Sequence, residues 1–476
     1  MFEQAISAMA SVVVDPYLLG LIFATTILGV IIGVLPGLGA TTGAALLLPF
    51  TLTMDPVHAI AVLATIYVSA TFAGSITAIL INTPGTSAAA ATTFDGYPLA
   101  QKGEAGRALG IAVISSTVGG IFSVIILCFA APLLARVAYE FRSPEYFALT
   151  VFGLSMLASI SAGGAVKNLI GGIFGVWLST IGAERVTGIE RFMFGNYELY
   201  EGLHFVPIFI GLFAISELLV QSKTVNKIIN TVTMKAVKLP TIEDYKKIWK
   251  TILRSCGIGT FIGVLPAEGA TVASMIGYSE ARRWSKNKKE FGKGAIEGIA
   301  GAEAANNAAT GGAMVPTMVL GIPGSGTTAI ILVGLMVHGL RPGVYLFTEQ
   351  VEKVYQIFGS MFVANILFML MGLYAAKIFA RVSLVPTAIL WPIVFALSVI
   401  GAYAFQGQLL DVWLALIFGV IGFFARRFGF SVAPIAVGLI LGEMVETNLQ
   451  LSLKVNIPHP KELKSYLDLV HNLYNL

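Results

Sequence analysis

The sequence predicts an all-α polytopic membrane protein with two inverted-topology repeats, re-entrant hairpins, broken helices and about 10–12 spans. Two observations support this fold class. First, 56% of the 476 residues are hydrophobic and only 12% are charged, whereas a soluble domain carries about 25% charge. Second, one short stretch occurs twice, half a chain apart. Apolar runs of about 20 residues, long enough to cross a bilayer as helices, recur throughout.

The duplicated stretch reads IGVLPGLGAT at residues 32–41 and IGVLPAEGAT at residues 262–271, an offset of 230 positions. Each copy is followed by a second Gly/Pro interruption, at residues 82–87 and 321–328, with Pro84 and Pro323 separated by 239 positions. A repeat unit this long indicates a duplicated domain rather than a solenoid. We therefore expect a first repeat over residues 1–220, a linker over 221–250, a second repeat over 251–450 and a polar tail over 451–476.

Basic residues indicate that the two repeats are inverted. No Lys or Arg precedes Lys102, whereas the second copy has basic segments on both sides, at 246–254 and 282–293. Lys and Arg prefer cytoplasmic loops, so one copy is expected near the outer face and the other near the inner face.

Each copy is predicted to form the tip of a re-entrant hairpin. A hairpin keeps both basic segments around residues 251–281 on one side, and non-helical backbone is tolerated at depth where protein or water surrounds it. A proline kink in an ordinary span is the alternative. Backbone carbonyls and Thr hydroxyls at such tips can bind a coupling cation. The candidate tip residues are Pro36, Gly37, Gly39, Thr41, Pro266, Glu268, Gly269 and Thr271.

The remaining elements follow from apolar runs and charge. In the first half a span is expected near residues 57–81, a weak helix over 88–99, and spans near 108–134, 146–164, 166–182 and 204–220. The linker is rich in Lys, which predicts a cytoplasmic location, and part of it has an amphipathic pattern. The second half repeats this plan, with many small residues over 295–320 that allow helices to approach closely.

The Gly/Pro interruptions are the predicted substrate site. A helix that restarts within the membrane presents unpaired N–H groups and a dipole that attract anions. Two such restarts, lined with hydroxyls, suit a substrate with two or more carboxylates; simple helix capping is the alternative. The candidates are Asn82, Thr83, Gly85, Thr86, Ser87, Gly324, Ser325, Gly326, Thr327 and Thr328.

Acidic and amide side chains supply further candidates for coupling. Glu268 and Glu303 are the ionisable residues expected nearest to membrane depth, and such a residue suggests a proton carrier or Na⁺ ligand. A wet interface is the alternative. Asn306 and Asn307 lie three and four positions after Glu303, on the same helical face.

Several function classes find no support in the sequence. No Walker A, Gly-x-Ser-x-Gly or His-Glu-x-x-His motif occurs, and the net charge of +4 does not indicate nucleic-acid binding. We expect a transporter and no enzyme, with no cofactor other than Na⁺ or H⁺ as coupling ion. An uncoupled anion channel or uniporter and, less readily, a membrane-embedded enzyme remain as alternatives.

Five motifs resemble a known family. Residues 33–40 (GVLPGLGA), 82–86 (NTPGT) and 95–100 (DGYPLA), together with 321–325 and 338–343, are similar to the large membrane subunit of tripartite tricarboxylate transporters, the TctA type. The second tip departs from the first, with Ala267 and Glu268 in place of Gly37 and Leu38. The resemblance covers almost the whole chain.

The resemblance implies a multi-pass protein of a bacterial or archaeal inner membrane. Its implied partners are a small TctB-type membrane subunit and a TctC-type periplasmic solute-binding protein, and a homodimer is compatible with this class. It further implies gradient-driven import of di- and tricarboxylates or related organic anions. Hairpins and broken helices would carry the substrate past a fixed scaffold, an elevator-type mechanism.

Overall fold

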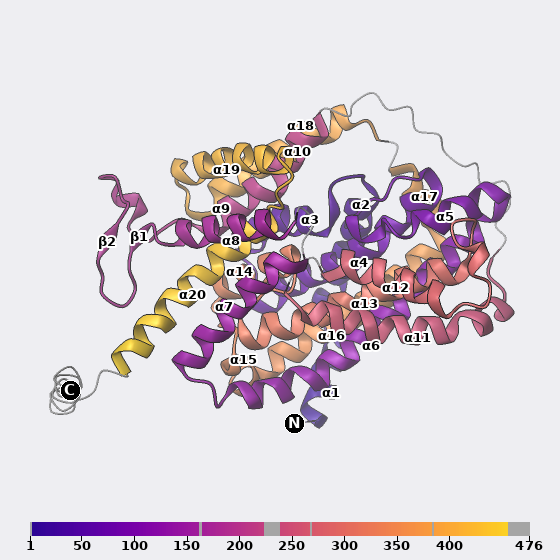
Figure 1. Cartoon of the computed structure of the whole chain (residues 1–476), viewed down its shortest axis with the longest axis horizontal. Coiled ribbons are helices and arrows are strands. Elements are labelled where there is room, and N and C mark those ends of the chain that lie inside the picture. Colours follow the sequence, from indigo (N-terminus) through magenta and orange to yellow (C-terminus); the bar gives the residue numbers. More distant parts are fainter. Residues whose placement is uncertain (1, 161–163, 223–238, 267–268, 383–384, 456–476) are drawn as a thin grey trace, which may run out of the picture.

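The computed structural model describes residues 2–160, 164–222, 239–266, 269–382 and 385–455, and most of them are helical. Figure 1 shows the helices as one continuous assembly, with α4 and α13 near its centre. The first half contains α1 (Phe2–Val14), α2 (Pro16–Val34), α3 (Gly39–Leu47), α4 (Pro56–Ile81), α5 (Thr93–Leu99), α6 (Ala105–Ala138), α7 (Ser143–Ile160), α8 (Ala165–Ser179), α9 (Phe205–Phe209) and α10 (Ser216–Gln221). A π-helical segment, η5 (Ile210–Ile215), joins α9 to α10.

The second half is also helical. It contains α11 (Ile242–Val264), α12 (Gly269–Trp284), α13 (Ile296–Leu320), α14 (Gly326–Val337), α15 (Val344–Thr348), α16 (Val351–Tyr374), α17 (Ala376–Val382), α18 (Thr387–Gln406), α19 (Leu409–Arg427) and α20 (Ala433–Val455). The strands β1 (Gly182–Ala183) and β2 (Glu190–Arg191) form a two-stranded antiparallel hairpin, and the described residues contain no other strand. The all-α prediction is therefore confirmed.

Local sequence explains where the central helices begin and end. Asp55 caps α4 by accepting a hydrogen bond from the backbone N–H of Val57, and Pro56 occupies the first turn, where no N–H is needed. The helix ends at Asn82, whose φ of 53° is left-handed, and α13 ends at Gly321 with φ of 69°. Asn and Gly are the residues that adopt this conformation most readily. Both Gly/Pro interruptions thus follow a left-handed helix end.

The duplicated helices cross each other in the same way in both halves. A Cβ added at Gly33 of α2 would lie 2.4 Å from the carbonyl oxygen of Ala70 in α4. A Cβ added at Gly263 of α11 would lie 2.4 Å from the carbonyl oxygen of Ala309 in α13. Gly33 and Gly263 are 230 positions apart, which is the offset between the two copies of the duplicated stretch. Ala70 and Ala309 are 239 positions apart, which is the offset between Pro84 and Pro323. The two halves therefore share one helix-crossing geometry, which depends on glycine at the contact.

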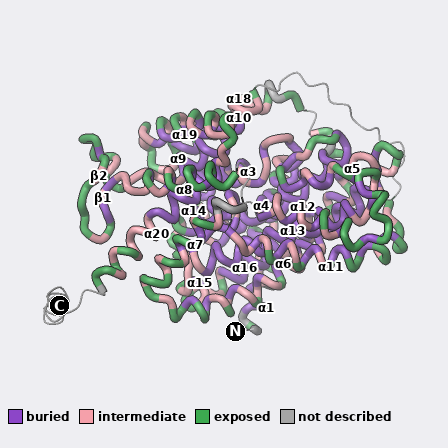
Figure 2. Tube along the Cα trace, in the orientation of Figure 1, coloured by how far each residue is buried: buried purple, intermediate pink, exposed green. Residues whose placement is uncertain are grey.

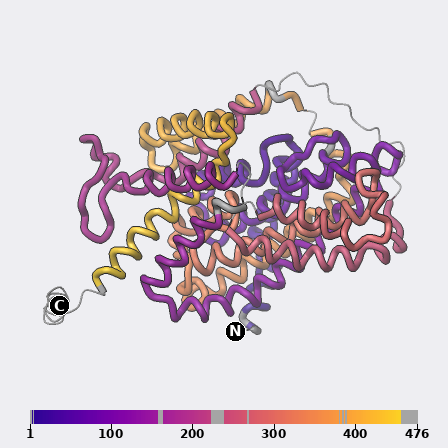
Figure 3. Tube along the Cα trace, in the orientation of Figure 1, coloured from indigo at the N-terminus to yellow at the C-terminus, as the bar shows by residue number. Residues whose placement is uncertain are grey.

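The two halves interlock rather than forming separate bodies. Helix α6 of the first half packs along α13, and α16 of the second half packs along α4. Figure 3 shows the corresponding mixture of early and late chain colours in the centre of the protein. Figure 2 shows that buried positions gather along α4 and α13. These two helices form the core that carries both interruptions.

Several helices have the length and apolar character of membrane spans. Within the described ranges, six qualify: Pro16–Val34, Pro56–Ile81, Thr93–Ala138, Val351–Tyr374, Ile389–Gln406 and Leu409–Arg427. Shorter apolar helices are Ala5–Val14, Ala165–Ser179, Phe205–Gln221 and Gly326–Val337. The protein is thus a multi-pass membrane protein. The larger span number and the inverted orientation of the repeats stay predictions.

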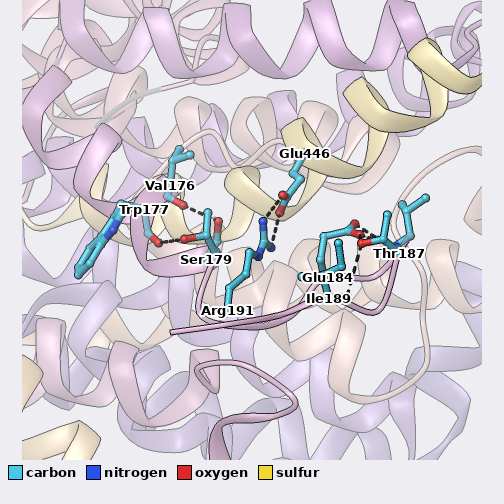
Figure 4. Close-up of polar contacts among 10 residues, drawn as sticks. Val176, Trp177, Ser179, Glu184, Thr187, Ile189, Arg191 and Glu446 are labelled. Carbon is cyan, nitrogen blue, oxygen red and sulfur yellow. Dashed lines mark hydrogen bonds and ion pairs between the residues drawn. The ribbon is translucent and has the colours of Figure 1, made fainter. Parts of the chain in front are cut away.

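The β1–β2 hairpin is attached to α20 by ion pairs. Arg191 donates two hydrogen bonds to the carboxylate of Glu446, one of them 2.9 Å long, as Figure 4 shows. The Nε of Arg185 lies 2.7 Å from Glu443. Inside the hairpin, Glu184 accepts a hydrogen bond of 2.5 Å from the backbone N–H of Thr187. Desolvation raises the pKa of the Glu184 carboxyl, but the hydrogen bonds that it accepts from Thr187 and Val186 lower this pKa overall. The hairpin is therefore built from polar contacts.

Candidate functional site

Two pairs of hydroxyl groups join the hairpin tip of each half to the interruption of the other half. The Oγ1 atoms of Thr41 and Thr327 are 2.8 Å apart. The Oγ of Ser87 and the Oγ1 of Thr271 are 2.9 Å apart. Thr41 and Thr271 are equivalent positions of the duplicated stretch. The predicted tip and substrate residues therefore meet in space, and each contact crosses between the halves.

Backbone packing at both interruptions leaves no room for side chains. The N–H of Gly85 donates a 3.2 Å hydrogen bond to the carbonyl oxygen of Gly74. A Cβ at Gly85 would lie 2.0 Å from the carbonyl oxygen of Gly33, and a Cβ at Gly324 would lie 2.8 Å from that of Gly263. Each interruption thus rests against the hairpin of its own half, while its neighbouring hydroxyl reaches the hairpin of the opposite half.

The second interruption restarts as a capped helix. The Oγ of Ser325 accepts a 3.2 Å hydrogen bond from the N–H of Thr328, and the Oγ1 of Thr328 accepts a 2.8 Å bond from the N–H of Ser325. The same Ser325 Oγ lies 3.4 Å from the hydroxyl of Tyr67 on α4. Capping is therefore one role that Ser325 and Thr328 perform in this structure. The buried Thr327 is directed instead to the opposite hairpin.

The first interruption differs from the expected long restart. A short 3₁₀ turn, η2 (Ser87–Ala89), follows it, and the next α-helix begins at Thr93 rather than at residue 88. A helix dipole is therefore weaker here than at α14. The Oγ1 of Thr86 is buried and has no hydrogen-bond partner within the described ranges.

Accessibility also differs between the two interruptions. Asn82, Thr83 and Ser87 are exposed. In the second half, residues 321–324 and 326–328 are buried, and Ser325 is half-buried. The two interruptions thus share a geometry but differ in access from outside the protein.

The first hairpin tip contacts a charged group at the end of α10. Gly37 has a φ of 89°, and a Cβ there would lie 1.7 Å from Nε2 of Gln221. The same hypothetical Cβ would lie 2.9 Å from Glu217, which forms an ion pair with Arg426 on α19. The neighbouring Pro36 is half-buried. The tip therefore rests on polar side chains that the sequence analysis did not identify.

The second hairpin tip is described in part. Pro266 and Gly269 are buried, whereas Glu268 lies outside the described residues. Gly39, the first-half equivalent of Gly269, has a φ of 44°. Both tips are breaks between consecutive helices, α2–α3 in one half and α11–α12 in the other.

Glu303 lies at the centre of a buried polar cluster. Its side chain has no exposed surface, and its Oε2 accepts a 2.7 Å hydrogen bond from the Oγ of Ser116. Its Oε1 accepts a hydrogen bond from Thr92, in the segment between η2 and α5. Sequence reasoning found Glu303 but missed Thr92 and Ser116, because nothing in the chain indicates that α6 crosses α13 at this level.

The two asparagines after Glu303 contact the first half. The Nδ2 of Asn306 lies 3.5 Å from the carbonyl oxygen of Ala88 and 3.4 Å from Glu303. The Nδ2 of Asn307 donates a 3.3 Å hydrogen bond to the carbonyl oxygen of Val68 in α4. Both side-chain carbonyl oxygens are buried without a partner among the described residues. These oxygens are available to a ligand or a water molecule.

Asp95 has a structural role between the halves. Its Oδ1 accepts three hydrogen bonds of 2.8 Å from the backbone N–H groups of Gly292, Gly294 and Ala295, immediately before α13. A carboxylate that satisfies several backbone donors stabilises the segment that carries them. Asp95 therefore positions the start of the helix that bears Glu303 and Asn306.

These features define a class of protein. It is a multi-pass helical membrane protein with a duplicated, interlocked core and two Gly/Pro interruptions, each of which contacts the hairpin tip of the other half. Residues 19–437 match the tripartite tricarboxylate transporter TctA family, and the chain belongs to that family. The protein is therefore a membrane subunit of a tripartite tricarboxylate transporter system, whose other components are in general of the TctB and TctC types.

Two relatives come from Agrobacterium vitis. One is an uncharacterized 52.8 kDa protein in the TAR-I ttuC′ 3′ region, 37% identical over 441 residues, which cover 91% of this chain and 86% of the relative. The other is an uncharacterized protein in the TAR-II ttuC′ 3′ region, 33% identical over 198 residues, which cover 42% of this chain and 82% of the relative. No solved structure matches the chain.

Proposed function

We propose that this protein is the transporting subunit of a secondary active importer for di- and tricarboxylates or related organic anions. It acts in the cytoplasmic membrane of a bacterium or archaeon and uses a Na⁺ or H⁺ gradient. A periplasmic solute-binding protein delivers the substrate, and a small membrane subunit assembles with it. The observation that carries the proposal is the pair of hydroxyl contacts, Thr41–Thr327 and Ser87–Thr271.

The chemistry of these pairs suits an organic anion. Hydroxyl groups and backbone N–H groups donate hydrogen bonds to carboxylates. They bind without the full charge of a buried Lys or Arg, so the substrate can be released again. Exposed Asn82, Thr83 and Ser87 provide an accessible set of polar groups beside the first interruption. The buried second interruption provides the hydroxyls of Ser325, Thr327 and Thr328.

The duplication supports alternating access. In transporters with inverted repeats, binding groups lie near the membrane midplane at the interface between the repeats, and one bundle moves against the other. The distribution of Lys and Arg supports opposite orientations of the two hairpins. One exposed and one buried interruption is the arrangement that one-sided access requires. Glycines at the helix crossings suit sliding contacts.

Uptake into proteoliposomes tests this function. The protein would be reconstituted with its small subunit and binding protein, and accumulation of labelled citrate and a panel of dicarboxylates measured with and without Na⁺ or proton gradients. The test variant is Ser87→Ala combined with Thr271→Val. The control is Ser279→Ala, because the Ser279 hydroxyl donates only to the backbone of its own helix.

Gradient-dependent accumulation by the wild type, reduced in the test variant and retained in the control, is the expected result. Equal accumulation by both variants would place the substrate site elsewhere. Flux that only equilibrates the substrate, whatever the gradient, would contradict a coupled importer and favour a channel or uniporter.

A further inference from the structure

The carboxylate of Glu303 is buried among neutral hydrogen-bond donors. Its neighbours are the hydroxyls of Thr92 and Ser116 and the amide of Asn306. Among the residues that the structure describes, no Lys, Arg or His forms an ion pair with it. An uncompensated charge in a protein interior costs several kcal/mol. The negative charge of Glu303 therefore has to be neutralised by a bound cation or by a proton.

The identity of the donors favours a proton over a metal cation. A hard cation collects several oxygen ligands around itself. Here each carboxylate oxygen of Glu303 already accepts a hydrogen bond from a hydroxyl group. The Nδ2 of Asn306 lies 3.4 Å from Oε2, and this nitrogen is a donor that cannot ligate a cation.

Hydroxyl groups allow both charge states of Glu303. Each hydroxyl can donate to an ionised carboxylate and can rotate to accept from a protonated one. Thr92 and Ser116 can therefore keep the carboxyl group hydrogen-bonded before and after proton uptake. A site with Lys or Arg as the donor would lack this property, because those side chains only donate.

The cluster is connected to the first interruption. Asn306 lies within hydrogen-bonding distance of both Glu303 and the carbonyl oxygen of Ala88. Ala88 belongs to the 3₁₀ turn that begins at Ser87, whose hydroxyl pairs with Thr271. A change at Glu303 thus reaches the hydroxyl pair through one side chain and one short turn.

Other titratable groups on the surrounding elements do not contact this carboxylate. They are His58 and Tyr67 on α4, Asp95 and Tyr97 on α5, Arg107, Cys128 and Arg136 on α6, Glu243, Asp244, Tyr245, Lys246, Lys247, Lys250, Arg254 and Cys256 on α11, Tyr278, Glu280, Arg282 and Arg283 on α12, and Glu297 on α13 itself. None forms a hydrogen bond or ion pair with Glu303 in the described part of the chain. Asp95 binds at the start of α13, and its Oδ2 lies beside Gly298, five positions or about 7.5 Å along the helix before Glu303 at 1.5 Å per residue.

We propose that Glu303 carries the coupling proton, with Thr92 and Ser116 as its hydrogen-bond partners and Asn306 as the link to the substrate interruption. This inference rests on the proposed importer function. In each cycle the carboxylate takes one proton from the outer side to become a carboxylic acid. It releases the same proton to the inner side, so the coupling ion is H⁺ rather than Na⁺.

The test compares Glu303→Gln with Glu297→Gln in the reconstituted complex. Glu297 is a matched control, since it lies on the same helix but bonds to Ser285 near the helix start. Three quantities are measured: citrate accumulation driven by a proton gradient without Na⁺, citrate exchange without any gradient, and the carboxyl band in pH-difference infrared spectra. Glu303→Asp is included because it keeps a titratable group.

The expected result has three parts. Glu303→Gln loses proton-driven accumulation but retains citrate exchange, and one pH-dependent carboxyl band disappears from its spectrum. Glu297→Gln behaves as the wild type in transport. Glu303→Asp retains a pH-dependent band at a shifted pH, which separates titration from a purely structural role.

Other outcomes overturn the assignment in distinguishable ways. Proton-driven accumulation in Glu303→Gln would remove Glu303 from coupling. Wild-type accumulation that needs Na⁺ and ignores the proton gradient would refute the proton while leaving the importer intact. If Glu303→Gln does not fold, the double variant Thr92→Val/Ser116→Ala is measured instead. A carboxyl band in its infrared spectrum that is unchanged in position and in pH dependence would refute the role of these two hydroxyls as partners of Glu303. Absence of accumulation of citrate and of every dicarboxylate in the panel by the wild type would refute the importer, and the infrared band would still decide whether Glu303 binds a proton.

Discussion

The hydroxyl of Thr41, beside the first hairpin tip, lies 2.8 Å from the hydroxyl of Thr327, beside the second interruption. These residues are 286 positions apart in the chain. Their contact has a counterpart in Ser87 and Thr271. If either hairpin moves, it must therefore either break its hydroxyl contact or move together with the partner hydroxyl, which belongs to the proposed substrate site.

This contact predicts coupling between Thr41 and Thr327. Valine removes each hydroxyl and keeps the branched shape, and a hydrogen bond of this kind contributes about 1 kcal/mol, or roughly fivefold in a rate or affinity. Thr41→Val, Thr327→Val and the double variant should show similar losses of citrate uptake, because the second substitution removes nothing further. Thr41→Ser is the control and should retain uptake. Additive losses would contradict a functional pair.

The close approach at Gly85 predicts a strong effect of one methyl group. Gly85→Ala places a Cβ 2.0 Å from the carbonyl oxygen of Gly33, a backbone atom that cannot move without the hairpin. We expect a lower unfolding temperature and little uptake. Gly324→Ala, with 2.8 Å to Gly263, should be milder. Gly20→Ala is the control: its Cβ meets nothing within 4 Å, and alanine in a helix gains about 0.5–1 kcal/mol. Thermal unfolding in detergent ranks the three, and equal stability of Gly85→Ala and Gly20→Ala would disprove the close contact.

The ion pair between Arg107 and Asp244 predicts a defined pH dependence. Asp244, at the charged start of α11, accepts hydrogen bonds of 2.6 and 3.0 Å from the Arg107 guanidinium. That contact lowers the pKa of Asp244 to about 2 from its usual 3.8. A lowered pKa stabilises the folded state above the usual value, and the stabilisation is lost as pH falls from about 4 to about 2.

Asp244→Asn should therefore lower the unfolding temperature by a constant amount between neutral pH and about pH 5, and the difference should shrink below about pH 4. Unfolding curves of wild type and variant across this range measure it. A difference that stays constant down to pH 2 would show that the charge of Asp244 is not the stabilising feature.

The attachment of the β1–β2 hairpin to α20 predicts local protection from proteolysis. Arg191 and Glu446 are each about one quarter exposed, whereas Arg185 is 66% exposed. Partly buried, bidentate pairs contribute more than exposed ones. Arg191→Met should speed cleavage between residues 184 and 201 more than Arg185→Met does. Limited proteolysis followed by mass spectrometry identifies the cut sites, and equal rates in both variants would mean that Glu446 does not retain the hairpin.

Much of the fold could be predicted from local chemistry. Proline and glycine cannot continue a regular helix without cost, so residues 35–39, 82–86 and 321–325 were identifiable as interruptions. Apolar composition indicated the membrane, and the recurrence of IGVLP indicated the duplication. The start of α5 was placed too early, at residue 88 rather than Thr93, because a run of alanines does not distinguish an α-helix from a 3₁₀ turn.

The candidate site was predictable only as a set of residue types. Ser87, Thr271, Thr41 and Thr327 were selected because they adjoin interruptions, but no periodic pattern states which hydroxyl meets which. The environment of Glu303 was not predictable either. Thr92 and Ser116 are ordinary hydroxyl residues in apolar surroundings, and they become its partners only because α6 crosses α13.

By itself, the sequence determined that the chain is helical, membrane-embedded and duplicated, and where its helices must break. Backbone geometry and hydrophobicity act locally, so these properties can be read residue by residue. The tertiary structure alone decided that each hairpin tip pairs with the interruption of the other half and that Glu303 is enclosed by neutral donors. Such contacts join residues separated by up to 286 positions, and they depend on how the interlocked helices cross.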